Sequence, residues 1–132
     1  LMVQHVIDTE GQPYAPDKWP RKPDCGSEGF LALDLRVGTV LSAEPFAKAR
    51  KPAYQLRVDF GPTVGVLQTS AQVTNYAAES LVGRRVVGAI NLGEKRIAGF
   101  TSQFLVLGAL SPDGTVNLLA PDGAPPDGAL VA

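Results

Sequence analysis

Cysteine and histidine are almost absent from this chain, which has one of each, Cys25 and His5, among 132 residues. A single cysteine cannot form an internal disulfide, and one thiol with one imidazole cannot supply the four ligands of a Cys/His zinc site. We therefore expect no structural metal and no bound cofactor. Neither side chain has a recognisable partner in the sequence, so we interpret both as bystanders rather than as catalytic groups.

Long apolar runs are also missing. No window approaches the roughly 18 uninterrupted apolar residues of a membrane span, and the first residues show no basic region followed by an apolar core and a cleavage site. The composition, with 45% apolar and 19% charged residues, is that of one globular domain that buries a core. The sequence therefore predicts a cytoplasmic protein without membrane insertion.

The net charge is small, at −1, but the charges are unevenly distributed. Residues 1–30 carry three Lys or Arg against five Asp or Glu, residues 31–104 carry nine against five, and residues 105–132 carry none against three. A basic centre between acidic ends can form a local positive patch, and a phosphate responds to the field within about 8–10 Å at physiological salt. Charges scattered over the surface without function fit the composition equally well.

Residues 1–30 are rich in proline and glycine, which predicts an extended arm. Because an aromatic residue such as Trp19 in a Pro-rich arm usually docks onto another surface, we expect the arm to pack along the domain or across a subunit boundary. The folded domain is expected at residues 31–120, with residues 121–132 as a C-terminal tail. Both ends resemble finishing segments, which favours a separate protein over a module of a larger one, although the chain begins with Leu1 rather than Met.

Short apolar runs with β-branched residues follow the arm, and Gly, Pro and Asp interrupt them at short intervals. The expected strands are 35–43, with a bend at Gly38, then 54–60, 64–67, 86–92 and 104–110, with an added terminal strand at 116–119. Thr69 or Ser70 is a suitable cap for a short helix ending near Tyr76. The chain is thus all-β with a short helix.

The order of these elements is β-β-β-α-β-β. This is the wiring of an OB-fold, a partly open five-stranded Greek-key barrel with its helix after the third strand. The sequence predicts such a barrel, preceded by the N-terminal arm and followed by a C-terminal extension.

Groups suited to catalysis are scarce. An enzyme needs paired acid and base groups, an activated nucleophile or a metal within mutual reach. Asp34 and Glu44 flank the first strand, but acidic residues at strand ends are usually solvated or paired with a neighbouring arginine such as Arg36. We therefore predict a protein without catalytic activity.

Two loops carry the residues that favour a binding function. In an OB-fold the loop between the first two strands and the loop between the last two flank the binding face. Cations follow phosphates, and an aromatic ring can stack on a base for about 1–3 kcal/mol. The RNA-binding hypothesis assigns this role to Lys48, Arg50, Lys51, Tyr54, Lys95, Arg96 and Ser102.

Other interpretations of these residues remain open. The residues from Lys48 to Tyr54 also fit an ordinary charged loop with Tyr54 in the core. Phe100 fits either an exposed or a buried position, whereas Phe104 is expected in the core. A hypothesis from a different class assigns apolar patches near Phe46, Tyr54 and Phe100 to the binding of extended segments of unfolded polypeptide. The Arg84-Arg85 pair is expected to be solvated.

Several motifs in order along the chain resemble the tRNA-binding domain family and, within it, the CsaA type. They are Asp34-Leu35-Arg36-Val37-Gly38, Arg50-Lys51-Pro52-Ala53-Tyr54, Thr69-Ser70-Ala71-Gln72-Val73-Thr74, Leu81-Val82-Gly83 and Ile97-Ala98-Gly99-Phe100-x-Ser102. The resemblance covers about residues 32–119. It implies an OB-fold that binds tRNA with little sequence selectivity.

The CsaA branch adds further expectations. Its members are small bacterial homodimers described as export-related chaperones of unfolded or precursor polypeptides, so the resemblance implies a homodimer and a chaperone alternative. The chain departs from that branch in two places. It has Asn91-Leu92-Gly93-Glu94 where CsaA proteins commonly carry a Pro-Pro pair after Asn-Phe, and its arm of 30 residues precedes the point at which family members tend to begin.

Overall fold

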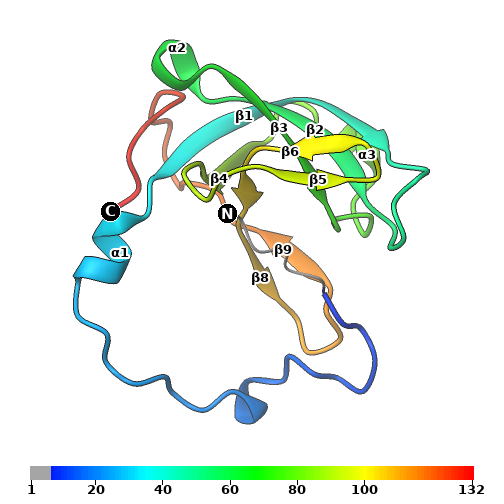
Figure 1. The fold of residues 1–132 in the computed structure, drawn as a ribbon, viewed down its shortest axis with the longest axis vertical. Coiled ribbons are helices and arrows are strands. Elements are labelled where there is room, and N and C mark those ends of the chain that lie inside the picture. Colours follow the sequence, from blue (N-terminus) through cyan, green and yellow to red (C-terminus); the bar gives the residue numbers. More distant parts are fainter. Residues whose placement is uncertain (1–6) are drawn as a thin grey trace.

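A computed structural model describes residues 7–132 of the chain (Figure 1). His5 lies outside the described residues. The helical elements are η1 (Pro16–Lys18), α1 (Glu28–Ala32), α2 (Gly61–Val64) and α3 (Ala78–Leu81). The strands are β1 (Leu35–Pro45), β2 (Tyr54–Asp59), β3 (Val66–Ala71), β4 (Arg85–Ala89), β5 (Lys95–Ile97), β6 (Phe100–Ser102), β7 (Leu105–Val106), β8 (Gly108–Leu110) and β9 (Val116–Leu118). None of the described helices has the length and apolar character needed to cross a membrane.

The main sheet has five antiparallel strands in the order β3-β2-β1-β4-β7, which confirms the OB-type barrel. The long strand β1 pairs with two neighbours along different parts of its length. Residues 35–39 pair with β4, and residues 39–45 pair with β2. The register shifts between Val40 and Ser42, so a bulge lies at Leu41, close to Gly38, where the sequence predicted a bend.

The barrel closes where β3 meets the segment after β6. The backbone amide of Gln103 donates to the Gln68 carbonyl at 2.8 Å, and the Gln68 amide donates to Oε1 of Gln103 at 3.0 Å. Nε2 of Gln68 also donates to the Thr101 carbonyl at 2.9 Å. Two glutamine side chains therefore complete a seam that backbone pairing alone leaves open.

An aromatic pair fills the barrel. Phe60 and Phe104 are fully buried and meet edge to face, with ring centroids 5.0 Å apart. Gly38 and Gly88 lie beside them on the inner face, and a Cβ atom there would approach the Phe60 ring to 2.9 and 2.8 Å respectively. These glycines are needed because the aromatic rings occupy the space that side chains would take. The prediction that Phe104 lies in the core is confirmed.

Some local expectations were wrong. Thr69 and Ser70 lie within β3 rather than at a helix cap, because residues 66–71 pair with β2 along their whole length. The helix after the third strand is α3, which is shorter and lies later in the chain. The fifth expected strand is divided into β7 and β8, and β8 pairs with β9 as a separate hairpin.

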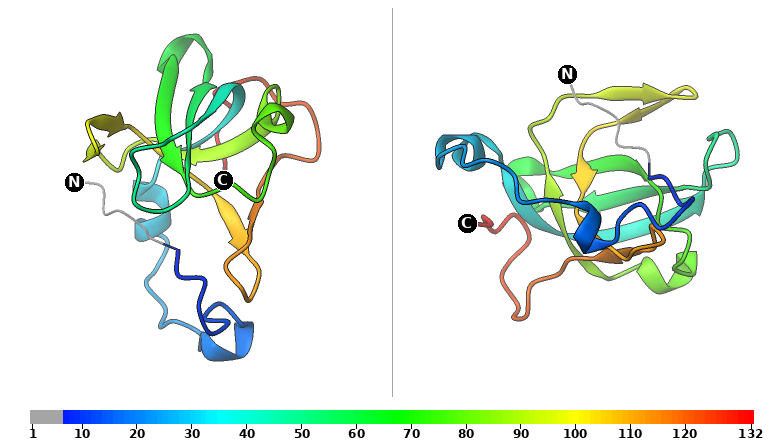
Figure 2. Two further views of the ribbon diagram at one scale, coloured as in Figure 1. Left: turned by 90° about the vertical axis from the view of Figure 1, so that its right-hand side faces the viewer. Right: turned by 90° about the horizontal axis from the view of Figure 1, so that it is seen from below.

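The arm leaves the barrel in a wide loop (Figure 1, dark to light blue). Its first described residues lie against the β8–β9 hairpin, where the Tyr14 amide donates to the Pro112 carbonyl at 3.1 Å. Trp19 stacks on Tyr14 with ring planes 13° apart, and its Nε1 donates to the Pro13 carbonyl at 2.8 Å. Figure 1 and the left view of Figure 2 show the following residues extending away from the barrel before they return to it at α1. The arm thus docks at its two ends.

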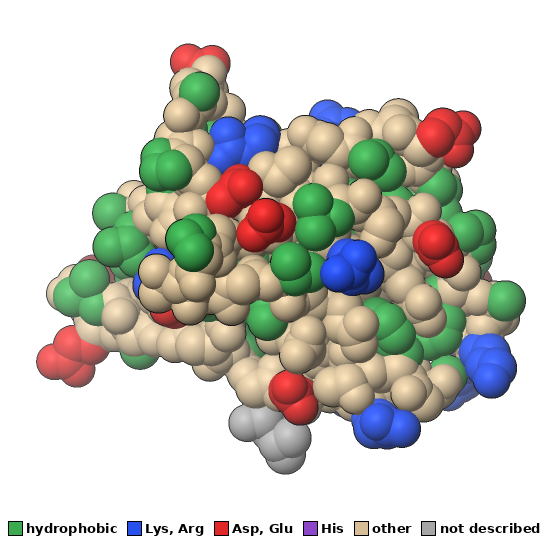
Figure 3. Space-filling view, turned by 90° about the horizontal axis from the view of Figure 1, so that it is seen from above, with side chains coloured by type: hydrophobic (Ala, Val, Ile, Leu, Met, Phe, Trp, Pro, Cys, Tyr) green, Lys and Arg blue, Asp and Glu red, His purple; other side chains and the backbone are tan. Residues whose placement is uncertain are grey.

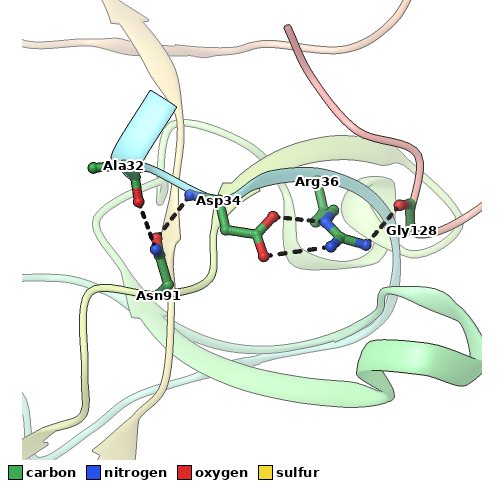
Figure 4. Close-up of polar contacts among 5 residues, drawn as sticks. All are labelled: Ala32, Asp34, Arg36, Asn91 and Gly128. Atoms are coloured by element: carbon green, nitrogen blue, oxygen red, sulfur yellow. Dashed lines mark hydrogen bonds and ion pairs between the residues drawn. The ribbon is translucent and has the colours of Figure 1, made fainter. Parts of the chain in front are cut away.

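A polar cluster fixes the start of β1 (Figure 4). Asn91 receives the Asp34 amide on Oδ1 and donates from Nδ2 to the Ala32 carbonyl, each at 2.8 Å. Arg36 pairs with the Asp34 carboxylate at 2.6 Å and donates to the Gly128 carbonyl at 3.2 Å. The expected pairing of Asp34 with Arg36 is confirmed, and it links β1 to the C-terminal segment.

The C-terminal segment runs along β1. The Gly128 amide donates to the Val37 carbonyl at 2.7 Å, and the Val37 amide donates to the Ala129 carbonyl at 3.0 Å. Asp127 accepts the Thr39 hydroxyl at 2.7 Å and lies 3.4 Å from Arg85. Arg85 is therefore half-buried and paired, which corrects the prediction of a solvated Arg84-Arg85 pair.

Candidate nucleic-acid interface

A groove lies between the loop that joins β1 to β2, residues 46–53, and the β5–β6 hairpin. Its volume is about 630 Å³. Residues of the β1–β2 loop form one wall, Ile97 and Ala98 of the hairpin form the other, and Ser70 and Gln72 contribute from β3 and the segment after it. The two loops expected to share a binding face therefore face each other across one groove.

An aromatic contact joins the two walls. Phe46 lies at the start of the loop and Phe100 opens β6, and their ring centroids are 5.4 Å apart. Phe46 is buried and Phe100 is half-buried. Tilted aromatic pairs of this kind contribute about 0.5–1.5 kcal/mol beyond the area that they bury. The contact holds the loop and the hairpin at a fixed separation.

The hairpin turns through Ala98 and Gly99. Both residues have positive φ angles, 48° and 84°, and the flanking Ile97 and Phe100 are paired. This is the geometry of a two-residue primed turn, which usually carries Asn-Gly or Asp-Gly. Because alanine takes the left-handed position here, the usual sequence signal for a hairpin is missing, and the sequence predicted only a loop between the last two strands.

The loop presents its cations to solvent. Lys48, Arg50 and Lys51 are all exposed, and none belongs to an ion pair of the described residues. Lys48, Arg50 and Lys51 also line the groove. By contrast, Arg36 and Arg85 are held by carboxylates, and the Arg84 guanidinium lies 4.6 Å from the centre of the Tyr76 ring. Arg57 of β2 is also exposed and outside these ion pairs, but the loop is where three such cations lie within four residues.

The hairpin adds two more cations. Arg96 is exposed and donates to the Thr101 hydroxyl at 3.2 Å. Lys95 is half-buried and lines a neighbouring apolar cavity of about 180 Å³ rather than the groove itself. Both side chains belong to the strand that carries the far wall, so they lie beside the groove and not within it.

Two residues of the RNA-binding hypothesis have structural roles instead. Ser102 is buried, and its hydroxyl lies 2.9 Å from that of Thr69, which in turn donates to the Phe104 carbonyl at 2.7 Å. Tyr54 is half-buried and donates from its hydroxyl to the Tyr76 carbonyl at 2.8 Å. The Ser102 hydroxyl is therefore engaged inside the protein, and the ring of Tyr54 packs against the core.

The apolar patch of the peptide hypothesis is also largely covered. Phe46 and Tyr54 are buried or half-buried, and Phe100 packs on Phe46. The large apolar side chains that the described residues do expose lie elsewhere, among them Trp19, Leu31 and Leu130.

Figure 3 shows the face seen from above the barrel. Basic side chains lie there in small separate groups among acidic and apolar ones. Those at the right-hand edge lie on the side that carries the β1–β2 loop in Figure 1. This face has no continuous basic track. The described residues also contain no group of three or more His, Cys, Asp or Glu side chains placed to hold a metal ion.

Comparison with known proteins gives a consistent result. The family model described as "Putative tRNA binding domain" matches residues 35–129. The chain is 35% identical to the methionine–tRNA ligase of Porphyromonas gingivalis over 121 residues, which are 90% of this chain and 18% of the ligase. It is 40% identical to that of Methanothrix thermoacetophila over 97% of this chain and again 18% of the ligase. The chain thus spans less than a fifth of the length of these relatives.

Solved structures resemble the fold over most of its length. A CsaA chaperone from Bacillus anthracis is 45% identical, with a TM-score of 0.79, over 83% of this chain and all of the chaperone. The CsaA chaperone protein of Picrophilus torridus has the same TM-score and coverage at 39% identity. Because the family model covers residues 35–129, including both walls of the groove, the chain belongs to the tRNA-binding domain family.

Proposed function

We propose that this chain is a non-catalytic, cytoplasmic RNA-binding domain that holds tRNA along the groove between the β1–β2 loop and the β5–β6 hairpin. The observation that carries the proposal is the group of exposed cations at Lys48, Arg50 and Lys51, which line the groove and lack acidic partners among the described residues. Arg96 and Lys95 extend the same positive charge onto the hairpin. Cations without acidic neighbours are available to phosphates.

Recognition in this proposal depends mainly on the RNA backbone. Phosphate contacts position a nucleic acid without reading its sequence, whereas base contacts specify it. Lys and Arg side chains line the groove, together with small apolar residues such as Ala49 and Ala53. Such a surface favours a structured RNA recognised by its shape and charge.

The proposal is tested by titrating the protein with bulk tRNA at two salt concentrations. We expect binding whose affinity falls steeply as salt rises, because each neutralised phosphate releases condensed counterions. Absence of binding, or binding that salt does not change, would contradict the proposal.

We also propose that the protein acts as a homodimer. The outer face of β1 and β4 carries Leu35, Val87 and Ala89, and the half-buried side chains of Leu92 and Leu105 pack against them. This second apolar cluster lies outside the barrel core, and an apolar face that remains partly open is suited to a second copy. Two grooves on one dimer would bind a structured RNA more tightly than one groove does.

Replacing Leu92 with Asp is expected to shift a dimer towards monomer, because a charge would enter the apolar contact at a loop position that bears no strand pairing. Sedimentation equilibrium measures the change. Leu41→Asp is the control, since Leu41 is also a leucine that solvent reaches, 42% exposed, but lies outside this cluster. A wild-type protein that stays monomeric at high concentration would refute the dimer.

A chaperone that binds unfolded polypeptide is the second candidate. It is favoured by the identity of 45% to a solved structure named a chaperone. Apolar side chains are also available, because Ile97 and Ala98 line the groove and Phe100 lines an adjoining cavity that shares Ala98 with it. Extended peptides can bind in apolar grooves or along strand edges. The coverage of Phe46 and Tyr54 weighs against a broad apolar patch, so RNA binding remains the first candidate.

The chaperone candidate predicts that Phe100→Asp abolishes the suppression of aggregation of an unfolded client protein, measured by light scattering. An apolar peptide segment that packed against a carboxylate at that position would remove water from the charge without replacing its hydrogen bonds, which costs free energy. Val82→Asp is the matched control, because Val82 is 53% exposed and does not line the groove. Equal suppression by the wild type and both variants would remove Phe100 from any peptide site.

A further inference from the structure

A second cavity, of about 260 Å³, continues from one end of the groove. The two share Lys51 and Gln72 in their walls, so the cavity adjoins the groove. The cavity is more polar than the groove, and its far wall is the turn between β8 and β9, residues 113–115. Its position makes it a continuation of the RNA-binding surface proposed above.

The arm supplies the remaining wall. The Ile7 amide donates to Oε1 of Gln72 at 3.1 Å, which fixes the arm at the mouth of the cavity. The arm then passes close over Gly114, where a Cβ atom would lie 3.1 Å from the Asp8 carbonyl oxygen and 3.1 Å from a methyl of Thr9. These arm residues precede the region that the family model covers, residues 35–129, so this wall is a feature of the extension.

The side chains around the cavity offer both a hydrogen-bond acceptor and a hydrogen-bond donor. Oδ1 of Asp113 accepts the Thr115 amide at 2.9 Å, and the side chain is exposed to solvent. The Thr115 hydrogen bonds hold the pKa of Asp113 below its ordinary value, so the group is an ionised acceptor at neutral pH. Across the cavity, Gln72 uses Oε1 for the arm, which leaves the Nε2 donor without an acceptor among the described residues.

The volume of the cavity limits the size of the ligand that it can hold. Pockets for drug-sized molecules have volumes of about 300–1,000 Å³, so a space somewhat below this range fits a single planar ring system. Proteins commonly bind unpaired RNA bases that are splayed out of the strand and hydrogen-bonded at their edges. A carboxylate accepts from the exocyclic amine of cytosine and repels the carbonyl that uracil has at the same position.

We propose that this cavity binds one base extruded from the RNA strand in the groove, and that Asp113 selects a base with an exocyclic amine, such as cytosine, over one with a carbonyl. The inference rests on the proposed RNA-binding function and adds a base preference to it. Lys51, at the boundary, would hold the phosphate beside the extruded base, since it lines both spaces.

The test compares the binding of oligo(C) and oligo(U) of equal length to the full chain by fluorescence anisotropy. We expect oligo(C) to bind about tenfold more tightly, the discrimination of one good base-edge contact. Asp113→Asn keeps an oxygen for the Thr115 amide but turns the other acceptor into a donor, so the preference should disappear or reverse. Asp122→Asn, at an exposed tail position, removes the same charge and should leave the preference unchanged.

The remaining outcomes are equally decisive. Equal affinity for the two oligonucleotides, or a preference that survives Asp113→Asn, overturns the inference while leaving salt-dependent tRNA binding intact. Failure of the wild type to bind any RNA overturns both this inference and the proposed function. Competition by free cytidine monophosphate as strong as that by oligo(C) overturns the assignment to a base within a strand.

Discussion

Replacing Lys48, Arg50 and Lys51 together with alanine is expected to weaken tRNA binding by roughly a hundredfold at low salt. Each exposed charge contributes up to about 1 kcal/mol, and about 1.4 kcal/mol corresponds to tenfold in affinity. The three side chains are exposed and surround one groove, so they should act on the same phosphates. The dependence of log affinity on log salt should become shallower by about one for each lost contact.

The control for this variant changes the total charge equally. Replacing Lys18, Arg21 and Lys22 with alanine also removes three exposed cations, but from the arm, far along the chain from the groove. If only the net charge of the protein mattered, both triple variants would lose the same affinity. A loop variant that binds as well as the arm variant would show that the groove is not the RNA site.

Replacing Gly61 with alanine is expected to destabilise the fold by roughly 3–4 kcal/mol. Gly61 has a φ of 88°, and a Cβ atom there would lie 2.5 Å from the backbone oxygen of Asp127. The left-handed conformation alone costs alanine about 1–2 kcal/mol. Displacing the C-terminal segment would also break the hydrogen bonds that join Asp127 to Thr39 and Gly128 to Val37, at about 1 kcal/mol each.

Gly65→Ala separates the two effects. Gly65 has nearly the same φ, 87°, but no atom lies within 4 Å of the position of its Cβ. It should therefore carry only the conformational cost, and urea unfolding of both variants measures the difference. Equal destabilisation would mean that the C-terminal segment yields without cost and contributes little to the barrel.

Much of the fold was predictable because strand signals are local. The alternation of residues 54–60 and the β-branched runs of β1 and β4 mark strands wherever they are placed. The helix prediction after the third strand failed at Thr69 and Ser70, because tertiary pairing with β2 outweighed their capping preference. The closure through Gln68 and Gln103 depends on contacts 35 residues apart, and no local pattern encodes it.

The candidate site was predictable to a lesser degree. Charge spacing indicated the loop at Lys48 to Lys51, and the wiring of the barrel brought it opposite the hairpin. The sequence could not show which of the candidate side chains are buried. Serine and tyrosine are common at binding sites. Only the structure reveals that the hydroxyls of Ser102 and Tyr54 form hydrogen bonds with Thr69 and Tyr76 inside the protein.

The pairing of the C-terminal segment with β1 also bears on the order of folding during synthesis. The bond from Arg36 to the Gly128 carbonyl joins residues 92 positions apart. On a ribosome, β1 would emerge long before the segment that pairs with it, and its open edge would meanwhile be available to other strands. Because contacts of such long sequence separation form slowly, the pairing of this segment with β1 should be the last step of barrel formation.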